Sequence, residues 1–167
     1  MSERATDTSG VTRQLAELVL GTDYAALRPS TAHSAKRLIL DTLACAIGAY
    51  ATVPGRTIAD FKRDQGGAPE ATLIGSPVKV PASSAAYAHA QMGNVLDADD
   101  TYNWTHSACA SVLSTIAVAE RVGATGQELL AAATVAFEVG TRIAFSMPIY
   151  RLDEAGHLAR RGAVGFS

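Results

Sequence analysis

The sequence predicts a mostly all-α protein, an antiparallel helical domain that carries one small β-hairpin. Hydrophobic residues make up 48% of the 167 residues, but aromatic residues make up only 6%. This mix favours closely packed helices filled by small side chains over a β-sandwich. Apolar residues recur at three-to-four spacing along most of the chain, and only residues 71–80 change character. The length suits one core. We therefore expect a disordered N-terminus over 1–10 and a single domain over 11–167.

Charge and hydropathy exclude several classes of protein. The formal net charge is -2 and no run of lysine or arginine exceeds two residues, so there is no electrostatic footprint for nucleic acid. No apolar segment reaches the roughly 18–20 uninterrupted residues of a membrane span. Residues 1–8 lack the apolar core of a signal peptide. We therefore expect a cytoplasmic protein that binds neither nucleic acid nor membrane. Cys45 and Cys109 are predicted to be small buried hydrophobes rather than a disulfide.

Three helices are expected in the first part of the chain. The first spans about 11–21, and the second opens at Pro29 and continues to Tyr50. The Val53-Pro-Gly55 segment is expected to break the chain before a short helix over 57–65. The inward face of the second helix repeats at helical spacing, and its members are Leu38, Ile39, Thr42, Leu43, Ala46, Ile47 and Tyr50.

The second part is predicted to begin with the hairpin. Segments 71–75 and 78–80 flank Ser76-Pro77 and resemble two short strands, which must lie on helices to be stable. A helix then starts at Pro81 and runs to about residue 96. Ser107 is expected to cap the next helix, 108–121. Thr125 and Glu128 have the spacing of a capping box that opens the last helix, 129–146. The tail, 150–167, has no capping pattern.

The polar segment between the helix predicted to end near residue 96 and the helix predicted over 108–121 is the candidate site. Three aspartates, Thr101 and His106 lie between apolar, alanine-rich stretches, where unsatisfied polar groups are costly. If the helix persists, Asp97, Asp100 and Thr101 share a face while Asp99 points away, and a turn could fold His106 back over Asp97. A carboxylate and an imidazole in one pocket could abstract or deliver a proton. The alternative is that the aspartates only end a helix and His106 only precedes a cap.

Other chemistry at this segment is less well supported. Asp97, Asp99 or Asp100 with His106 offers metal ligands, but the spacing matches no calcium loop or zinc motif, so we expect no metal and no other cofactor. Cys109 would need a lowered pKa to act as a nucleophile, and an inert buried thiol is expected instead. His157, beside Gly156, is either catalytic or mobile.

The chain resembles the N-terminal part of the MmgE/PrpD family, which includes 2-methylcitrate dehydratase and cis-aconitate decarboxylase. The resemblance is centred on residues 88–101, Ala-His-Ala-Gln-Met-Gly-Asn-Val-Leu-Asp-Ala-Asp-Asp-Thr, and on the histidine that follows, His106. It is also carried by segments 35–48, 71–75, 117–120 and 123–129. In order and spacing it covers roughly residues 11–146.

This resemblance implies a mostly helical domain, a dimer and cofactor-free lyase chemistry on citrate-like tricarboxylates. Family residues that match Asp97, Thr101 and His106 line the active site, and a later histidine, for which His157 is the candidate, joins them. The family's lysines and tyrosine come from a later portion, and its proline after the motif histidine is Ser107 here. Cations that could bind substrate carboxylates are Arg142, Arg151, Arg160 and Arg161.

Three functions follow from these observations. The first is a lyase, a dehydratase or decarboxylase of a carboxylate substrate, in which His106 is acid or base, Asp97 orients it and Thr101 binds substrate. The second is a relative repurposed for another dehydration or isomerisation in a biosynthetic pathway. The third is a non-catalytic subunit that dimerises with a longer homologue. In each case we expect a homodimer, or a partner chain that carries the missing part of the site.

Overall fold

The fold is known from a computed structural model, which describes residues 10–102, 105–146, 150–152 and 158–160. The predicted fold class is confirmed, because six α-helices and a small antiparallel hairpin make up most of this part of the chain. Residues 1–9 of the predicted disordered N-terminus lie outside it. The elements in order are α1 (Val11–Gly21), the 3₁₀ helix η1 (Tyr24–Ala26), α2 (Pro29–Tyr50), α3 (Val53–Asp64), β1 (Ala71–Thr72), β2 (Lys79–Val80), α4 (Ala82–Asn94), α5 (Ser107–Val122), α6 (Gly126–Ser146), β3 (Tyr150–Leu152) and β4 (Leu158–Arg160).

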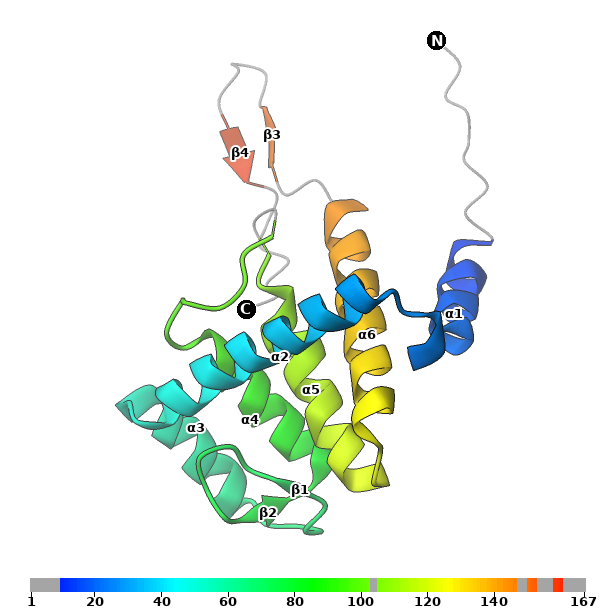
Figure 1. Cartoon of the computed structure of the whole chain (residues 1–167). Coiled ribbons are helices and arrows are strands. Elements are labelled where there is room, and N and C mark those ends of the chain that lie inside the picture. Colours follow the sequence, from blue (N-terminus) through cyan, green and yellow to red (C-terminus); the bar gives the residue numbers. More distant parts are fainter. Residues whose placement is uncertain (1–9, 103–104, 147–149, 153–157, 161–167) are drawn as a thin grey trace.

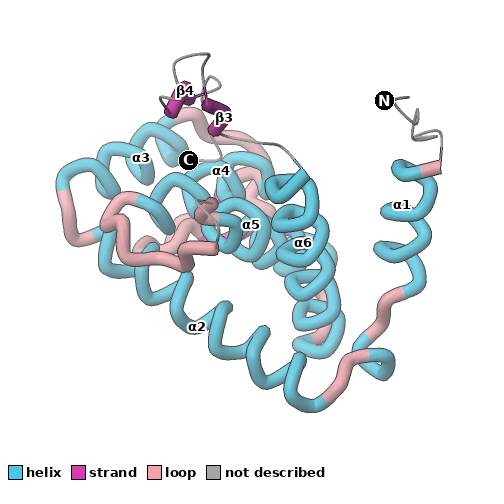
Figure 2. The backbone as a smooth tube through the Cα atoms, turned by 90° about the horizontal axis from the view of Figure 1, so that it is seen from above, coloured by secondary structure: helices cyan, strands magenta, loops and turns pink. Residues whose placement is uncertain are grey.

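Helix α5 lies at the centre of the domain. It packs between α4 and α6, and α2 runs across all three (Figure 1). Seen from above, α1 stands apart from the other helices on the far side of α6 (Figure 2). The main core cluster consists largely of small side chains, as the composition predicts, and its larger members are Leu73, Val80, Met92 and Leu113. Small side chains allow helix axes to approach closely, which buries backbone as well as side chains.

Gly93 illustrates this close approach between α4 and α5. A Cβ atom at Gly93 would lie 2.8 Å from Leu113 Cδ1 and 3.0 Å from Cys109 Cβ. We therefore expect Gly93→Ala to lower the free energy of unfolding by about 1–3 kcal/mol through overpacking. The matched control is Gly140→Ala in α6, where no described atom lies within 4 Å, and which should be neutral or stabilising by up to about 1 kcal/mol. Equal urea midpoints for the two variants would contradict this account.

Several predicted helix ends differ from the structure. Helix α3 begins at Val53, so the expected break at 53–55 is wrong. The Thr52 hydroxyl accepts a hydrogen bond from Gly55 N at 3.2 Å, and Pro54 lies in the first turn, where a missing N–H costs nothing. The capping box is confirmed, since Glu128 N donates to Thr125 Oγ1 and Thr125 N to Glu128 Oε2. The second hairpin, β3–β4, was not predicted.

Glu120 of α5 fastens the first hairpin to the helices. Its carboxylate accepts from Thr72 N at 2.6 Å and from Thr72 Oγ1 at 2.7 Å, and lies 2.9 Å from Lys79 Nζ. His89 of α4, which is buried, holds the same hairpin, because its Nε2 lies 3.1 Å from both Ile74 N and Thr72 O. This ring nitrogen either accepts from Ile74 N or donates to Thr72 O, so His89 adds one bond to those of Glu120 in supporting the two-stranded hairpin.

This arrangement predicts a stability change with pH. Burial raises the pKa of the Glu120 carboxyl, but the bonds from Thr72 and Lys79 outweigh burial and lower the pKa to about 2. A depressed folded-state pKa gives stability that is present above about 4.5 and is lost as pH falls toward 2. The gap in urea midpoint between wild type and Glu120→Gln should therefore shrink by roughly half or more between pH 6 and pH 3. A difference in urea midpoint that stays constant from pH 6 to pH 3 would contradict this role of the Glu120 carboxylate.

Two helical surfaces bear on the expected location and partners. Helix α6 is the one helix in the described ranges that is long and apolar enough to cross a membrane by length and composition, a test that buried core helices also pass, and α2 with α3 would pass as a pair bent by 90°. Helix α6 contacts α5, α2 and α1. On the outer side of α2, Leu40 is 70% exposed and Ile47, which was predicted to face inward, is 59% exposed.

Candidate functional site

The polar segment forms a corner between α4 and α5. Helix α4 ends at Asn94, so the predicted continuation to residue 96, and with it the shared helical face of Asp97, Asp100 and Thr101, is wrong. Asp97 N donates to Asn94 O at 3.0 Å, and Asp97 has a φ of 50°, the one positive φ among the described non-glycine residues. Aspartate enters this left-handed region more readily than most residues. The chain therefore turns sharply at Asp97 instead of continuing as a helix.

This turn brings two carboxylates to His106. Asp99 Oδ1 lies 3.2 Å from His106 Nδ1, and Asp97 Oδ1 lies 3.8 Å from His106 Nε2. The Asp99 side chain has no exposed surface, whereas that of Asp97 is 84% exposed. The prediction that a turn could fold His106 back over Asp97 is in line with this geometry. The partner at the shorter distance, however, is Asp99, which the helical-face argument had pointing away.

Asp100 and Cys109 have structural roles at the start of α5. Ala108 N donates to Asp100 Oδ1 at 2.9 Å, so Asp100 performs the capping that was predicted for Ser107, which instead is the first helical residue. Burial raises the pKa of the Asp100 carboxyl, the bond from Ala108 lowers it, and the nearby Asp99 raises it, with a net upward shift. Burial, together with Asp99 and Asp100, raises the pKa of the Cys109 thiol to about 12, as expected for an inert thiol. Cys45 and Cys109 are both free and buried, as predicted.

The other predicted site residues are placed less closely. Thr101 is exposed at the corner. Arg142 is exposed on α6, where its Nε donates to Glu138 Oε1 at 2.6 Å. The end of α6 nevertheless reaches the corner. Phe145, one helical turn after Arg142, packs against Tyr102 with the ring centroids 5.0 Å apart. His157 lies outside the described residues, as do the side chains of Arg151, Arg160 and Arg161.

The corner fits a metal ion poorly. Asp97, Asp99 and His106 each offer a ligand atom, and these atoms lie within 4.8 Å of one another. The two nitrogens of an imidazole point in different directions, however, and Asp99 lies at Nδ1 while Asp97 lies at Nε2. An ion bound at Nε2 would have His106 and Asp97 as direct ligands, whereas Asp99 would only hydrogen-bond the other ring nitrogen. These direct ligands are fewer than the three protein ligands of catalytic zinc sites.

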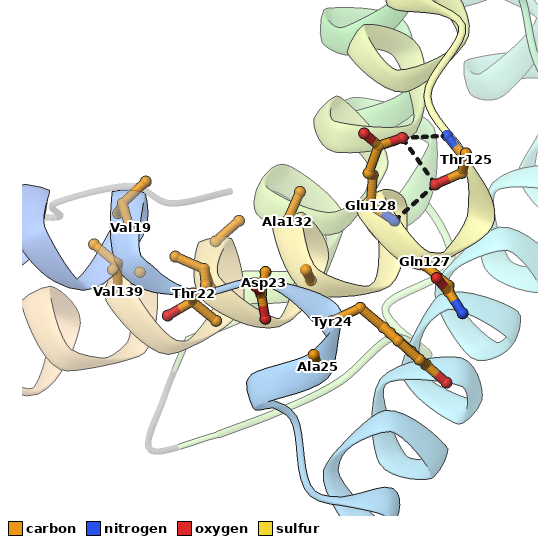
Figure 3. Close-up of a pocket in the computed structure, with 14 residues that line it drawn as sticks. Val19, Thr22, Asp23, Tyr24, Ala25, Thr125, Gln127, Glu128, Ala132 and Val139 are labelled. Carbon is orange, nitrogen blue, oxygen red and sulfur yellow. Dashed lines mark hydrogen bonds between the residues drawn. The ribbon is translucent and has the colours of Figure 1, made fainter.

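A groove of about 1180 Å³ lies elsewhere, between the α1–η1 segment and α6. Figure 3 shows that Val19, Thr22 and Tyr24 come from the α1–η1 segment and that Ala132 and Val139 come from α6. Its charged lining residues are acidic, and they already cap helices, since Asp23 accepts from Ala26 N and Glu128 is bonded to Thr125. The described lining of this groove holds no histidine, and its two carboxylates are engaged in helix caps, so it offers no group free for proton transfer. The corner remains the candidate site.

Comparison with known proteins agrees with the sequence resemblance. A search of curated proteins found no match to the chain. The family model described as MmgE/PrpD N-terminal domain matches residues 13–165. This match includes the whole corner and also residues 150–165 of the tail, whereas the resemblance described above covers roughly residues 11–146. The chain belongs to the MmgE/PrpD family and represents its N-terminal domain.

Proposed function

We propose that this chain contributes the acid–base corner of a cofactor-free lyase, a dehydratase or decarboxylase that acts on a small carboxylate substrate. The observation that carries the proposal is the placement of His106 between two aspartates, inside a chain whose family membership suggests dehydratase-like function. His106 would abstract or deliver the proton next to a substrate carboxylate or at the leaving group. Asp97, which is exposed 3.8 Å from His106 Nε2, would face the substrate, and so would the exposed Thr101.

The charge of the corner indicates that another group takes part. Asp97, Asp99 and Asp100 surround His106, and no lysine or arginine within the described ranges forms an ion pair with any of them. An anionic substrate needs cations to offset its charge. Arg142 lies one turn from Phe145 at the edge of the corner, and it would provide a cation if it were released from Glu138. Further cations would come from His157, from a second copy of the chain, or from a partner chain.

A second candidate function rests on the outer face of α2. Leu40 and Ile47 lie seven residues apart on one face of this helix and are both largely exposed, as is Val53 at the start of α3, which is 82% exposed. Exposed apolar surface of this kind is typical of protein interfaces. This favours a chain that assembles, either as a homodimer or as a non-catalytic subunit of a longer homologue.

A substrate panel with light scattering tests both candidates. The purified chain, with its mass measured in solution, is incubated with hydroxy-tricarboxylates, hydroxy-dicarboxylates and their unsaturated counterparts, and products are followed by proton NMR. The lyase proposal expects loss or gain of water or carbon dioxide from at least one class. The subunit function would be favoured instead if the chain is a homodimer that turns over no member of the panel by itself, and turnover appears when a longer homologue is mixed with it.

A further inference from the structure

The two carboxylates beside His106 differ in a way that assigns them different roles. Asp99 lies at Nδ1 with its side chain fully buried, and Asp97 lies at Nε2 with its side chain 84% exposed. We propose that Asp99 is a positioning residue: it holds the imidazole in the tautomer with the proton on Nδ1 and so leaves Nε2, on the exposed side, as the nitrogen that reacts. This inference rests on the proposed function, in which His106 is the acid–base group.

Asp99 is itself held in place. Asn94, the last residue of α4, donates from Nδ2 to Asp99 Oδ1 at 3.2 Å, so the end of α4 fixes the same oxygen that faces His106. The second oxygen, Oδ2, is buried and has no hydrogen-bond partner in the described part of the chain. A carboxylate has no proton to donate, so the hydrogen between Asp99 Oδ1 and Nδ1 must come from the ring. Because the buried Asp99 carboxylate has few hydrogen-bond donors, the bond from the Nδ1 hydrogen to its Oδ1 contributes strongly to its stabilisation.

The remaining contacts of the ring agree with this assignment. The backbone carbonyl of His106 accepts from the Cys109 thiol at 2.9 Å, which ties the histidine to the first turn of α5. Its Nε2 faces Asp97, whose left-handed backbone is an uncommon conformation of the kind found at functional sites. The substrate would approach on this side, because the Asp97 side chain is exposed there whereas that of Asp99, at Nδ1, is buried. The orienting role that the sequence assigned to Asp97 thus passes to Asp99, and Asp97 is left to face the substrate.

The tautomer can be measured without any substrate. A long-range proton–nitrogen NMR spectrum of the ¹⁵N-histidine-labelled chain, recorded above the pH at which His106 is protonated, shows which ring nitrogen carries the hydrogen. His106→Gln assigns the signals. We expect hydrogen on Nδ1 in the wild type. Asp99→Ala removes the acceptor at Nδ1 and leaves Asp97 at Nε2, so the hydrogen should move to Nε2, and turnover of the substrate found in the panel should fall by about 10²–10⁴-fold with little change in KM. Asp97→Ala, the matched control, should leave the tautomer unchanged.

The outcomes separate the two claims. Hydrogen on Nε2 in the wild type, or the same tautomer in wild type and Asp99→Ala, overturns the positioning role of Asp99, and the wild-type spectrum decides this even where the variant fails to fold. Turnover that survives in Asp99→Ala at the wild-type level overturns it as well. The expected tautomers, in a chain whose panel shows no turnover alone or with a partner, overturn the proposed function while the Asp99–His106 arrangement stands.

Discussion

Replacing His106 with alanine is expected to lower turnover by about two to four orders of magnitude, because in the proposed mechanism the variant loses the group that moves the proton. His106 is the one described histidine at the corner, and its side chain is 26% exposed, so a substrate can reach it. The loss should appear in kcat, with a smaller change in KM, since the imidazole acts mainly in the transition state. The measurement is steady-state kinetics on the substrate that the panel identifies.

The matched control for this variant is His33→Ala. His33 is exposed on α2, and the same change of side chain there should leave turnover within about a factor of two of the wild type. Thermal unfolding of both variants checks that the fold persists. Wild-type turnover in a folded His106→Ala variant would remove His106 from the mechanism.

Leu113→Ala is expected to have the largest effect on stability. Leu113 is fully buried in α5, in the core cluster that includes Met92, and its side chain closes over Gly93. Removing it loses transfer free energy and leaves a cavity between α4 and α5. We expect a loss of about 2–5 kcal/mol. This corresponds to a melting temperature lower by roughly 5–20 °C in a chain of this size, measured by circular dichroism.

Val118→Ala provides the comparison on the same helix. Val118 is 51% exposed, so its truncation should change the free energy of unfolding by no more than about 0.5 kcal/mol. Similar losses in the two variants would mean that α5 is not the centre of the core.

The helices were predictable from the sequence because their apolar residues keep a regular period and their ends carry recognisable signals. The Thr125–Glu128 capping box is one such signal, and the proline at the start of α2 is another. The start of α3 was missed because Val53-Pro-Gly55 was interpreted as a breaker, although Thr52 can cap a helix whose first turn accepts proline. The β3–β4 hairpin was missed because its strands have only three residues each, too few for an alternating pattern to be recognised.

The polar segment lies between two helices, as predicted, but its internal geometry was predicted wrongly. Helical spacing paired Asp97 with Thr101, and that argument holds only while the helix continues, whereas α4 ends at Asn94. Asparagine is common at helix ends, so this residue was the available signal. Nothing in the spacing could show that Asp99 would be buried, because its burial depends on how α5 packs against α4 after the turn at Asp97. A non-helical turn decides which carboxylate meets the imidazole.

The most direct test of the acid–base claim is exchange of solvent deuterium into recovered substrate. Wild-type chain and His106→Ala are incubated in D₂O with the panel member that is turned over, and the carbon next to the substrate carboxylate is followed by NMR. We expect deuterium to enter this position with the wild type faster than product forms or together with it, and to fall to the uncatalysed rate with His106→Ala. Undiminished exchange with His106→Ala would contradict the assignment of the proton transfer to this corner.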